Sequence, residues 1–214
     1  IFAIVLVALF VCSCAQPPST SLPIDARYQQ AATVIQEAIE FEMADKKLPA
    51  FAIVLVDDQD LVMAQAFGEA QPGEPANLET VYRVGSVSKL FTDIGVMQLV
   101  EKGEIDLDAP VNEYIPDFKP RNTTDTPITL RQLTSHRSGL IREPRVGHYF
   151  DAEEPTLAAT VASLNGTDLI YDPENRTKYS NAGIAVVGYT LEVLKQQPFV
   201  DYLQQAVLKP MGLH

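Results

Sequence analysis

Apolar and polar positions follow two different periods along the chain, and the change of period predicts its elements. Over residues 25–48 the apolar residues recur every three or four positions, which predicts an amphipathic helix that ends before Pro49. They are Val34, Ile35, Ala38, Ile39 and Met43. Two apolar runs follow, over 50–56 and 61–67, and the polar turn between them predicts a β-hairpin. The next stretch, 68–77, holds two glycines and two prolines and is expected to be a loop.

The rest of the chain is predicted to be mostly helical. A short strand over 81–84 leads into a helix over 86–102, which ends at Gly103. The apolar side of this helix is expected to consist of Leu90, Ile94, Met97 and Leu99. Thr129 is expected to cap a short helix over 130–135. Further helices are predicted over 155–164, 181–196 and 199–209. We therefore expect an α+β fold, in which the hairpin needs additional strands because two strands alone do not make a stable sheet.

The composition limits the partners and the metal sites that the chain can have. Its 214 residues include 16 lysines and arginines against 28 aspartates and glutamates, which gives a net charge of −12 at pH 7. This acidic balance argues against nucleic acid as a partner, because phosphate binding needs clustered cations. Both cysteines lie within the first 14 residues, so the sequence after them excludes disulfides and thiolate metal sites. The three histidines lack the spacing of a metal site, and we expect no metal and no cofactor.

The first residues of the chain resemble an export signal. Residues 1–12 are apolar throughout, and a helix of that length reaches only about 18 Å, against about 30 Å for a bilayer core. Because Cys14 follows this run and a small residue, residues 1–14 resemble a bacterial lipobox, in which the cysteine receives a lipid. Residues 15–24 are then a tether, and residues 25–214 belong to a folded domain that the lipid holds at the membrane of the bacterial cell envelope. An ordinary cleaved signal and a truncated membrane anchor are the alternatives.

A serine and a lysine three residues apart are the first candidates for catalysis. Ser86 lies where the predicted strand turns into a helix, and Lys89 lies on the same helical face one turn further on. A serine hydroxyl attacks a carbonyl only after a base removes its proton, and a desolvated lysine can act as that base. The backbone N–H of Ser86, at a helix N-terminus, suits one half of an oxyanion hole. Alternatively, Ser86 only caps the helix and Lys89 is a surface charge. Ser88 is the weaker nucleophile candidate, because no lysine follows it three residues later.

Tyr179 and Asn181 form a second candidate pair, at the start of the helix predicted over 181–196. Because they lie two residues apart in an extended loop, their side chains can point in the same direction. A tyrosinate can accept a proton, and an amide can hold a substrate carbonyl. The alternative is a capping loop, in which Asn181 caps the helix and Tyr179 packs against it.

The two motifs, in this order, resemble the serine β-lactamase and penicillin-binding-protein superfamily, in its class C-related branch. Three other stretches contribute to the resemblance, which covers residues 25–214. They are 101–111 (EKGEIDLDAPV), 130–140 (LRQLTSHRSGL) and 179–188 (YSNAGIAVVG). In the second stretch, Ser135 and Arg137 stand where the family usually has threonines, and His136 is expected to have a structural role. The residues of the loop that follows, which contains Arg142, are expected to be solvated, and the alternative is that they line a substrate cleft.

The resemblance implies a β-lactamase/transpeptidase-like fold and a serine hydrolase that forms an acyl-enzyme on Ser86. Lys89 and Tyr179 would share the proton transfers, and Asn181 would orient the substrate. That substrate would be a small molecule or a peptide: an ester, a β-lactam or a D-amino-acid peptide. The family's third motif, Lys-Thr-Gly or His-x-Gly, has no match in the sequence, so we expect this chain to be the front part of a longer domain and inactive by itself. The alternative function is a catalytically silent envelope protein that binds cell-wall peptide or a protein partner.

Overall fold

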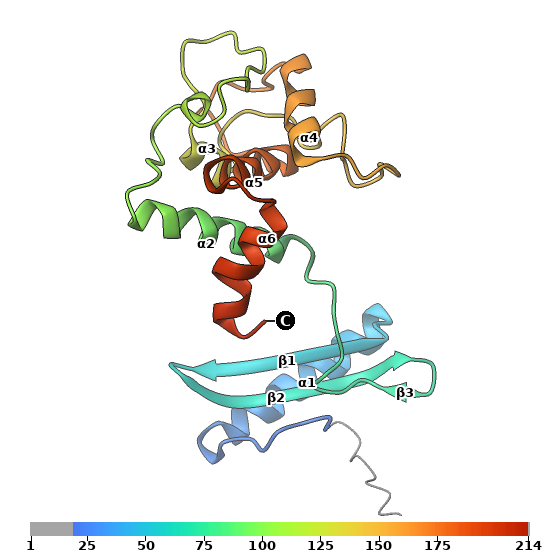
Figure 1. Ribbon diagram of the computed structural model, residues 1–214. Helices are drawn as coiled ribbons and strands as arrows, with labels where there is room; N and C mark the ends of the chain where they lie inside the picture. Colours follow the sequence, from blue (N-terminus) through green and yellow to red (C-terminus); the bar gives the residue numbers. More distant parts are fainter. Residues whose placement is uncertain (1–18, 214) are drawn as a thin grey trace, which may run out of the picture. The chain divides into compact units, whose positions relative to one another are not determined.

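The computed structural model describes residues 19–213, so the predicted signal segment and Cys14 lie outside the described residues. The chain divides into two compact units, one up to Arg83 and one from Val84 onward (Figure 1). The first unit contains a small sheet and the second is built from helices. This combination confirms the predicted α+β class.

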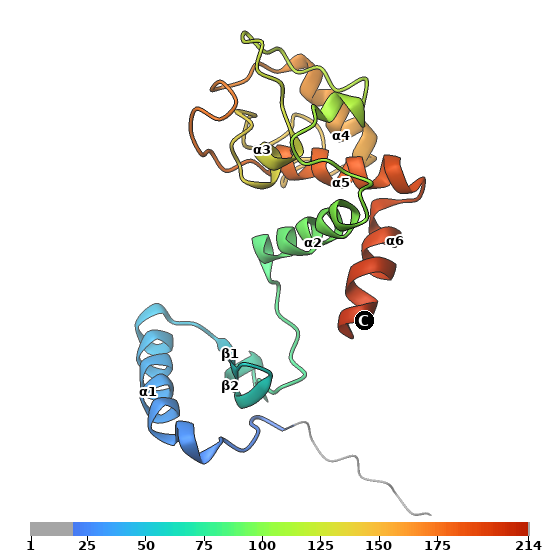
Figure 2. The ribbon, with the colours of Figure 1, turned by 90° about the vertical axis from the view of Figure 1, so that its left-hand side faces the viewer.

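The first unit packs one helix against a hairpin. α1 (Gln29–Lys46) ends at Lys47, whose left-handed backbone closes the helix. β1 (Ala50–Asp57) and β2 (Asp60–Gln71) are antiparallel neighbours, as the sequence predicts. Figure 2 shows α1 running along one side of the two strands.

The buried face of α1 is narrower than the sequence pattern predicts. Ala32 and Ile39 are buried, but Val34 is 60% exposed and Ala38 is also exposed. The expectation that Val34 and Ala38 face the core is therefore wrong. Successive residues of a helix are separated by about 100°, so these two side chains are turned away from the line through Ala32 and Ile39.

The second strand is longer than the sequence pattern predicts. β2 continues into the region 68–77 and pairs there with a short strand, β3 (Glu74–Pro75), so the expectation of a loop was wrong for these residues. Gly68 has a φ of +77°, and a Cβ at this position would overlap the carbonyl oxygen of Pro49. The next amide, of Glu69, donates a hydrogen bond to that same oxygen at 2.8 Å. Glycine therefore lets the strand pass close to the preceding backbone and continue.

An irregular segment, instead of a strand, precedes the first helix of the second unit. Residues 81–84 are not assigned to any strand, and Val81 is 94% exposed, so the strand predicted there is wrong. A 3-10 turn, η2 (Gly85–Val87), leads directly into α2 (Ser88–Glu101). The helix predicted over 86–102 is confirmed, with a tighter first turn.

The remaining helices of this unit agree with the predicted ranges to within a few residues. They are α3 (Leu130–Thr134), α4 (Leu157–Ser163), α5 (Asn181–Lys195) and α6 (Phe199–Leu203), which continues through a π-helical turn, Gln204–Leu208. Thr129 caps α3 as predicted: its hydroxyl oxygen accepts from the amide of Gln132 at 3.3 Å, and the side chain of Gln132 accepts from the amide of Thr129 at 3.0 Å. Among the described residues, no helix is both long and apolar enough to cross a membrane.

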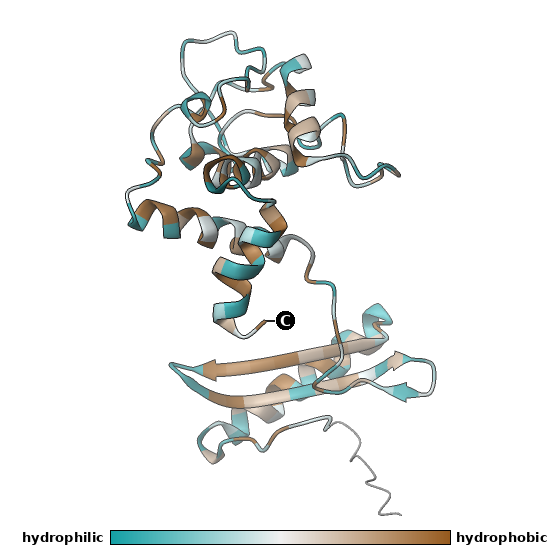
Figure 3. Cartoon of the chain, in the orientation of Figure 1, coloured by the Kyte–Doolittle hydropathy of each residue, from teal (hydrophilic) through white to brown (hydrophobic). Residues whose placement is uncertain are grey.

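α2 packs against α5 and α6 through a face that differs from the predicted one. Its buried residues are Thr92, Gly95, Val96 and Leu99. Three of the four residues expected in the core are exposed instead, namely Leu90, Ile94 and Met97. Hydrophobic residues are visible on both sides of this helix in Figure 3. Because α2 is apolar over most of its circumference, its sequence does not determine which stripe faces the core.

Candidate active site

The first turn of α2 positions Lys89 toward Ser86. Ser86 lies in the turn η2, two residues before α2 begins, and its side chain is exposed. The ammonium of Lys89 donates a hydrogen bond to the Ser86 hydroxyl oxygen, with an Nζ–Oγ distance of 3.3 Å. The two side chains lie on one helical face, as their spacing predicts. Ser86 is therefore not only a helix cap, and Lys89 is not an isolated surface charge.

The packing of α2 against α5 brings Tyr179 to the same serine. Tyr179 precedes the first turn of α5, and its hydroxyl oxygen lies 2.5 Å from Oγ of Ser86. Gly95 allows the two helices to approach, because a Cβ there would lie only 3.3 Å from a methyl carbon of Leu191. The structure thus brings together three of the four predicted site residues.

The charges around Tyr179 favour its ionised form. The ammonium of Lys89 beside its hydroxyl, and next the hydrogen bond with Ser86, lower the pKa of Tyr179 from its usual value. Nζ of Lys89 lies 5.0 Å from the centre of the tyrosine ring, and the guanidinium carbon of Arg142 lies 5.2 Å from it. A tyrosinate in this position can accept the proton of the Ser86 hydroxyl, which would make the serine a nucleophile.

His136 supports the tyrosine from its other side. The rings of His136 and Tyr179 lie 4.5 Å apart, and Nδ1 of His136 accepts a hydrogen bond from the backbone N–H of Ser180 at 3.3 Å. Partial burial, and then the charge of Lys89, lower the pKa of His136. The neutral ring therefore accepts a hydrogen bond and packs, in agreement with the structural role expected for it.

Asn181 does not cap α5, so that alternative is wrong. The capping residue is Ser180, whose hydroxyl oxygen accepts a hydrogen bond from the amide of Gly183 at 2.8 Å. The side chain of Asn181 is directed instead to Glu143, with an Nδ2–Oε1 distance of 2.6 Å. Asn181 lies two residues after Tyr179, at the same end of α5, as the sequence predicts.

Two contacts of this site were missed by the reasoning from sequence. The side chain of Arg142 is 66% exposed, as expected for a solvated loop residue, but its guanidinium also lies over the ring of Tyr179. Glu143 gave no signal at all, because a single carboxylate in a loop has no spacing to interpret. Both contacts depend on the path of the loop beside α5.

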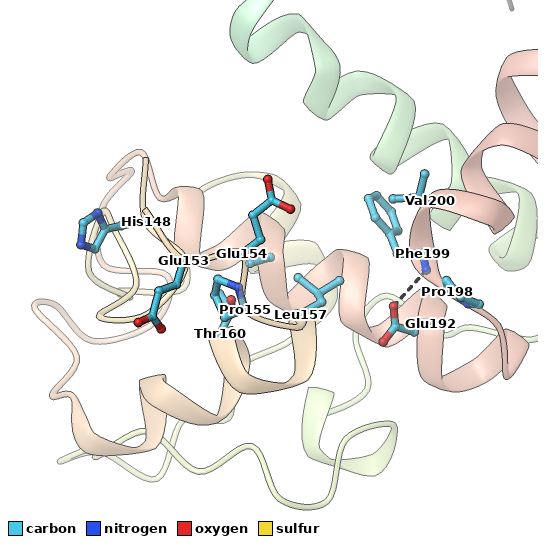
Figure 4. Close-up of a pocket in the computed structure, with 12 residues that line it drawn as sticks. His148, Glu153, Glu154, Pro155, Leu157, Thr160, Glu192, Pro198, Phe199 and Val200 are labelled. Atoms are coloured by element: carbon cyan, nitrogen blue, oxygen red, sulfur yellow. Dashed lines mark hydrogen bonds between the residues drawn. The ribbon is translucent and has the colours of Figure 1, made fainter. Parts of the chain in front are cut away.

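A pocket of about 480 Å³ lies on the same unit, between α4, α5 and the start of α6 (Figure 4). Apolar side chains such as Leu157 and Phe199 line it together with the carboxylates of Glu154 and Glu192. It reaches α5 at Ala185, but none of the four predicted site residues lines it. The serine and its partners therefore lie outside this pocket. Within residues 19–213, no group of three or more histidine, cysteine, aspartate or glutamate side chains could hold a metal ion.

Comparisons with known proteins identify the family of the chain. Residues 35–214 match the family described as Beta-lactamase. Beta-lactamase-like protein 2 of Dictyostelium discoideum is 30% identical over 198 residues, which cover 88% of this chain and 36% of that protein. Esterase EstB of Burkholderia gladioli is 29% identical over 163 residues, which cover 70% of this chain and 41% of the esterase.

The solved structures include a similar fold. EstCE1, described as a hydrolase with promiscuous acyltransferase activity, superposes with a TM-score of 0.80 at 25% identity, over 89% of this chain and 54% of that one. The chain thus spans between about a third and a little over half of the length of these relatives. The predicted β-lactamase/transpeptidase-like fold is confirmed, and the chain belongs to the beta-lactamase family.

Proposed function

We propose that the protein containing this chain is a serine hydrolase that forms an acyl-enzyme on Ser86. One observation is central to the proposal. The Ser86 hydroxyl oxygen lies 2.5 Å from the hydroxyl of Tyr179 and 3.3 Å from the ammonium of Lys89. A nucleophile, an ionisable acceptor and a cation that stabilises the ionised acceptor are therefore within contact of one another.

The first half of the proposed reaction transfers the acyl group to the enzyme. The tyrosinate of Tyr179 takes the proton of the Ser86 hydroxyl while Oγ forms a bond to the substrate carbonyl carbon. The carbonyl oxygen becomes an oxyanion, which the backbone N–H of Ser86 helps to stabilise in the first turn of the helix. Tyr179 then gives its proton to the leaving group as the bond between that group and the carbonyl carbon breaks.

The second half releases the product by the reverse sequence. A water molecule gives a proton to Tyr179 as its oxygen attacks the acyl carbon. The bond to Ser86 breaks, and the proton on Tyr179 returns to the serine oxygen. Lys89 stays protonated throughout and stabilises the negative charge on Tyr179 whenever it forms. In this scheme Tyr179 is the base, and the positive charge of Lys89 favours its ionised form.

Esters are one class of substrate that the names of the relatives support. One relative is named an esterase, and EstCE1 is described as a hydrolase with acyltransferase activity. Amides and lactams require the same attack on a carbonyl, so they remain within the proposal. A catalytically silent envelope protein is the less favoured function, because it gives no reason for the contacts among Ser86, Lys89 and Tyr179.

Labelling with a fluorescent fluorophosphonate tests the proposal in the full-length protein. The reagent is expected to label the wild-type protein at Ser86, and Ser86→Ala is expected to abolish both labelling and hydrolysis of p-nitrophenyl acetate. Ser88→Ala is the matched control, since Ser88 is an exposed serine two residues further on, and it is expected to retain both. Labelling that persists in Ser86→Ala, or none in the wild type, would contradict the proposal.

A further inference from the structure

The loop segment 141–143 runs alongside the first turn of α5 and binds it through the backbone. The carbonyl oxygen of Arg142 accepts a hydrogen bond from the amide of Asn181 at 2.8 Å. The hydroxyl of Ser180 donates to the carbonyl oxygen of Ile141 at 2.7 Å. Amides in the first turn of a helix have no acceptor within the helix, so this segment supplies one. The end of α5 that holds the site residues is thereby attached to the loop.

The side chain of Glu143 adds a contact that helix capping does not require. Its Oε1 accepts a hydrogen bond from Nδ2 of Asn181 at 2.6 Å, a short bond, and bonds to a charged acceptor are shorter than those between neutral groups. A carboxylate only accepts, and the amide of asparagine donates from its nitrogen alone. The contact therefore determines which end of the amide faces Glu143. The second N–H of Nδ2 and the Oδ1 atom are then held in a defined orientation.

The carboxylate of Glu143 has a second contact besides Asn181, with the guanidinium of Arg142. Nε of Arg142 lies 3.5 Å from the same Oε1 atom, and the side chain of Glu143 is only 35% exposed. Arg142 in turn lies over the ring of Tyr179. The glutamate is thus placed between the cation beside the tyrosine and the amide of Asn181. A partly buried carboxylate that contacts a guanidinium moves less freely than a solvated one, so it can orient the amide of Asn181.

We propose that Glu143 is a positioning residue of this active site: it holds the amide of Asn181 so that its free N–H points at the carbonyl group of a bound substrate. The inference rests on the proposed function. It also assigns a role to a residue outside both sequence motifs, 38 positions from the residue on which it acts.

A double-mutant cycle on the full-length protein, with p-nitrophenyl acetate as substrate, tests this role. Glu143→Ala is expected to raise KM and to lower kcat/KM about tenfold to hundredfold, the range for losing a hydrogen bond to a charged group. In an Asn181→Ala background the same substitution is expected to change kcat/KM by less than about twofold, because the residue through which it acts is absent. Glu143→Gln keeps an acceptor oxygen and is expected to recover most of the activity. Glu113→Ala, at an exposed glutamate, is the control and is expected to match the wild type.

Two results would overturn the role of Glu143. One is a wild-type kcat/KM in Glu143→Ala, and the other is an equal loss in the Asn181→Ala background, which would mean that Glu143 only supports the fold. Thermal unfolding shows whether each variant is folded. If Glu143→Ala is not, Glu143→Met, which keeps the length of the side chain without the carboxylate, takes its place in the same cycle. Fluorophosphonate labelling of the wild type is read separately, so that failure of the proposed function and failure of this inference are distinguished.

Discussion

Replacing Tyr179 by phenylalanine removes one oxygen atom and leaves the ring in place. That oxygen lies 2.5 Å from Oγ of Ser86, and the ring packs against His136 at 4.5 Å. A positioned general base contributes on the order of 10²- to 10⁴-fold to a rate, which corresponds to about 2.7 to 5.4 kcal/mol of activation free energy. The packing of the ring is retained, so the free energy of unfolding is expected to change by only about 0.5 to 1.5 kcal/mol. We therefore expect a loss of activity that far exceeds the loss of stability.

The assay is the pH dependence of kcat/KM for p-nitrophenyl acetate, measured on the full-length protein. A base acts only when it is deprotonated, so the wild-type rate is expected to rise with pH through the pKa of Tyr179, which lies below the usual tyrosine value. Tyr179→Phe is expected to lower the rate and to remove that rise. Tyr149→Phe is the matched control, because Tyr149 is 81% exposed, and we expect it to behave as the wild type. Full hydrolysis by Tyr179→Phe would refute the assignment of Tyr179 as the base.

Two further predictions concern the stability of the helical unit. Burial raises the pKa of Asp93 to about 6, and its Oδ1 has no hydrogen-bond partner among the described residues. The folded protein holds this proton more tightly than the unfolded chain, so stability is expected to fall as pH rises from about 4 to about 6. Asp93→Asn is expected to remove this fall in stability. After allowance for solvent screening, it is expected to raise the free energy of unfolding by about 1 kcal/mol at pH 7, measured by urea unfolding. An unchanged pH profile of stability would contradict this. Gly139 has a φ of +76°, and a Cβ there would overlap the carbonyl oxygen of Tyr171. Gly139→Ala is therefore expected to cost more than about 2 kcal/mol, whereas Gly166→Ala, with nothing within 4 Å of its Cβ, is expected to change stability by less than about 0.5 kcal/mol.

Local relations along the chain were sufficient to identify the candidate catalytic residues. Ser86 and Lys89 are three residues apart, and any helix places such a pair on one face. Tyr179 and Asn181 lie at the start of a strongly apolar helix, and Thr129 begins another in a capping box with Gln132. These relations involve only neighbouring residues, so the sequence alone determined them.

The long-range relations were decided by the tertiary structure. α2 has two apolar stripes, and the sequence pattern favours the one with Leu90, yet the close approach of α5 at Gly95 buries the stripe with Val96. The sequence also contains no sign that Glu143 contacts Asn181, because the contact depends on how a loop runs beside a helix 38 positions away. A periodic pattern shows which residues of an element can be buried together. It does not show which distant segment buries them or binds a polar group among them, because that contact forms only when the chain folds.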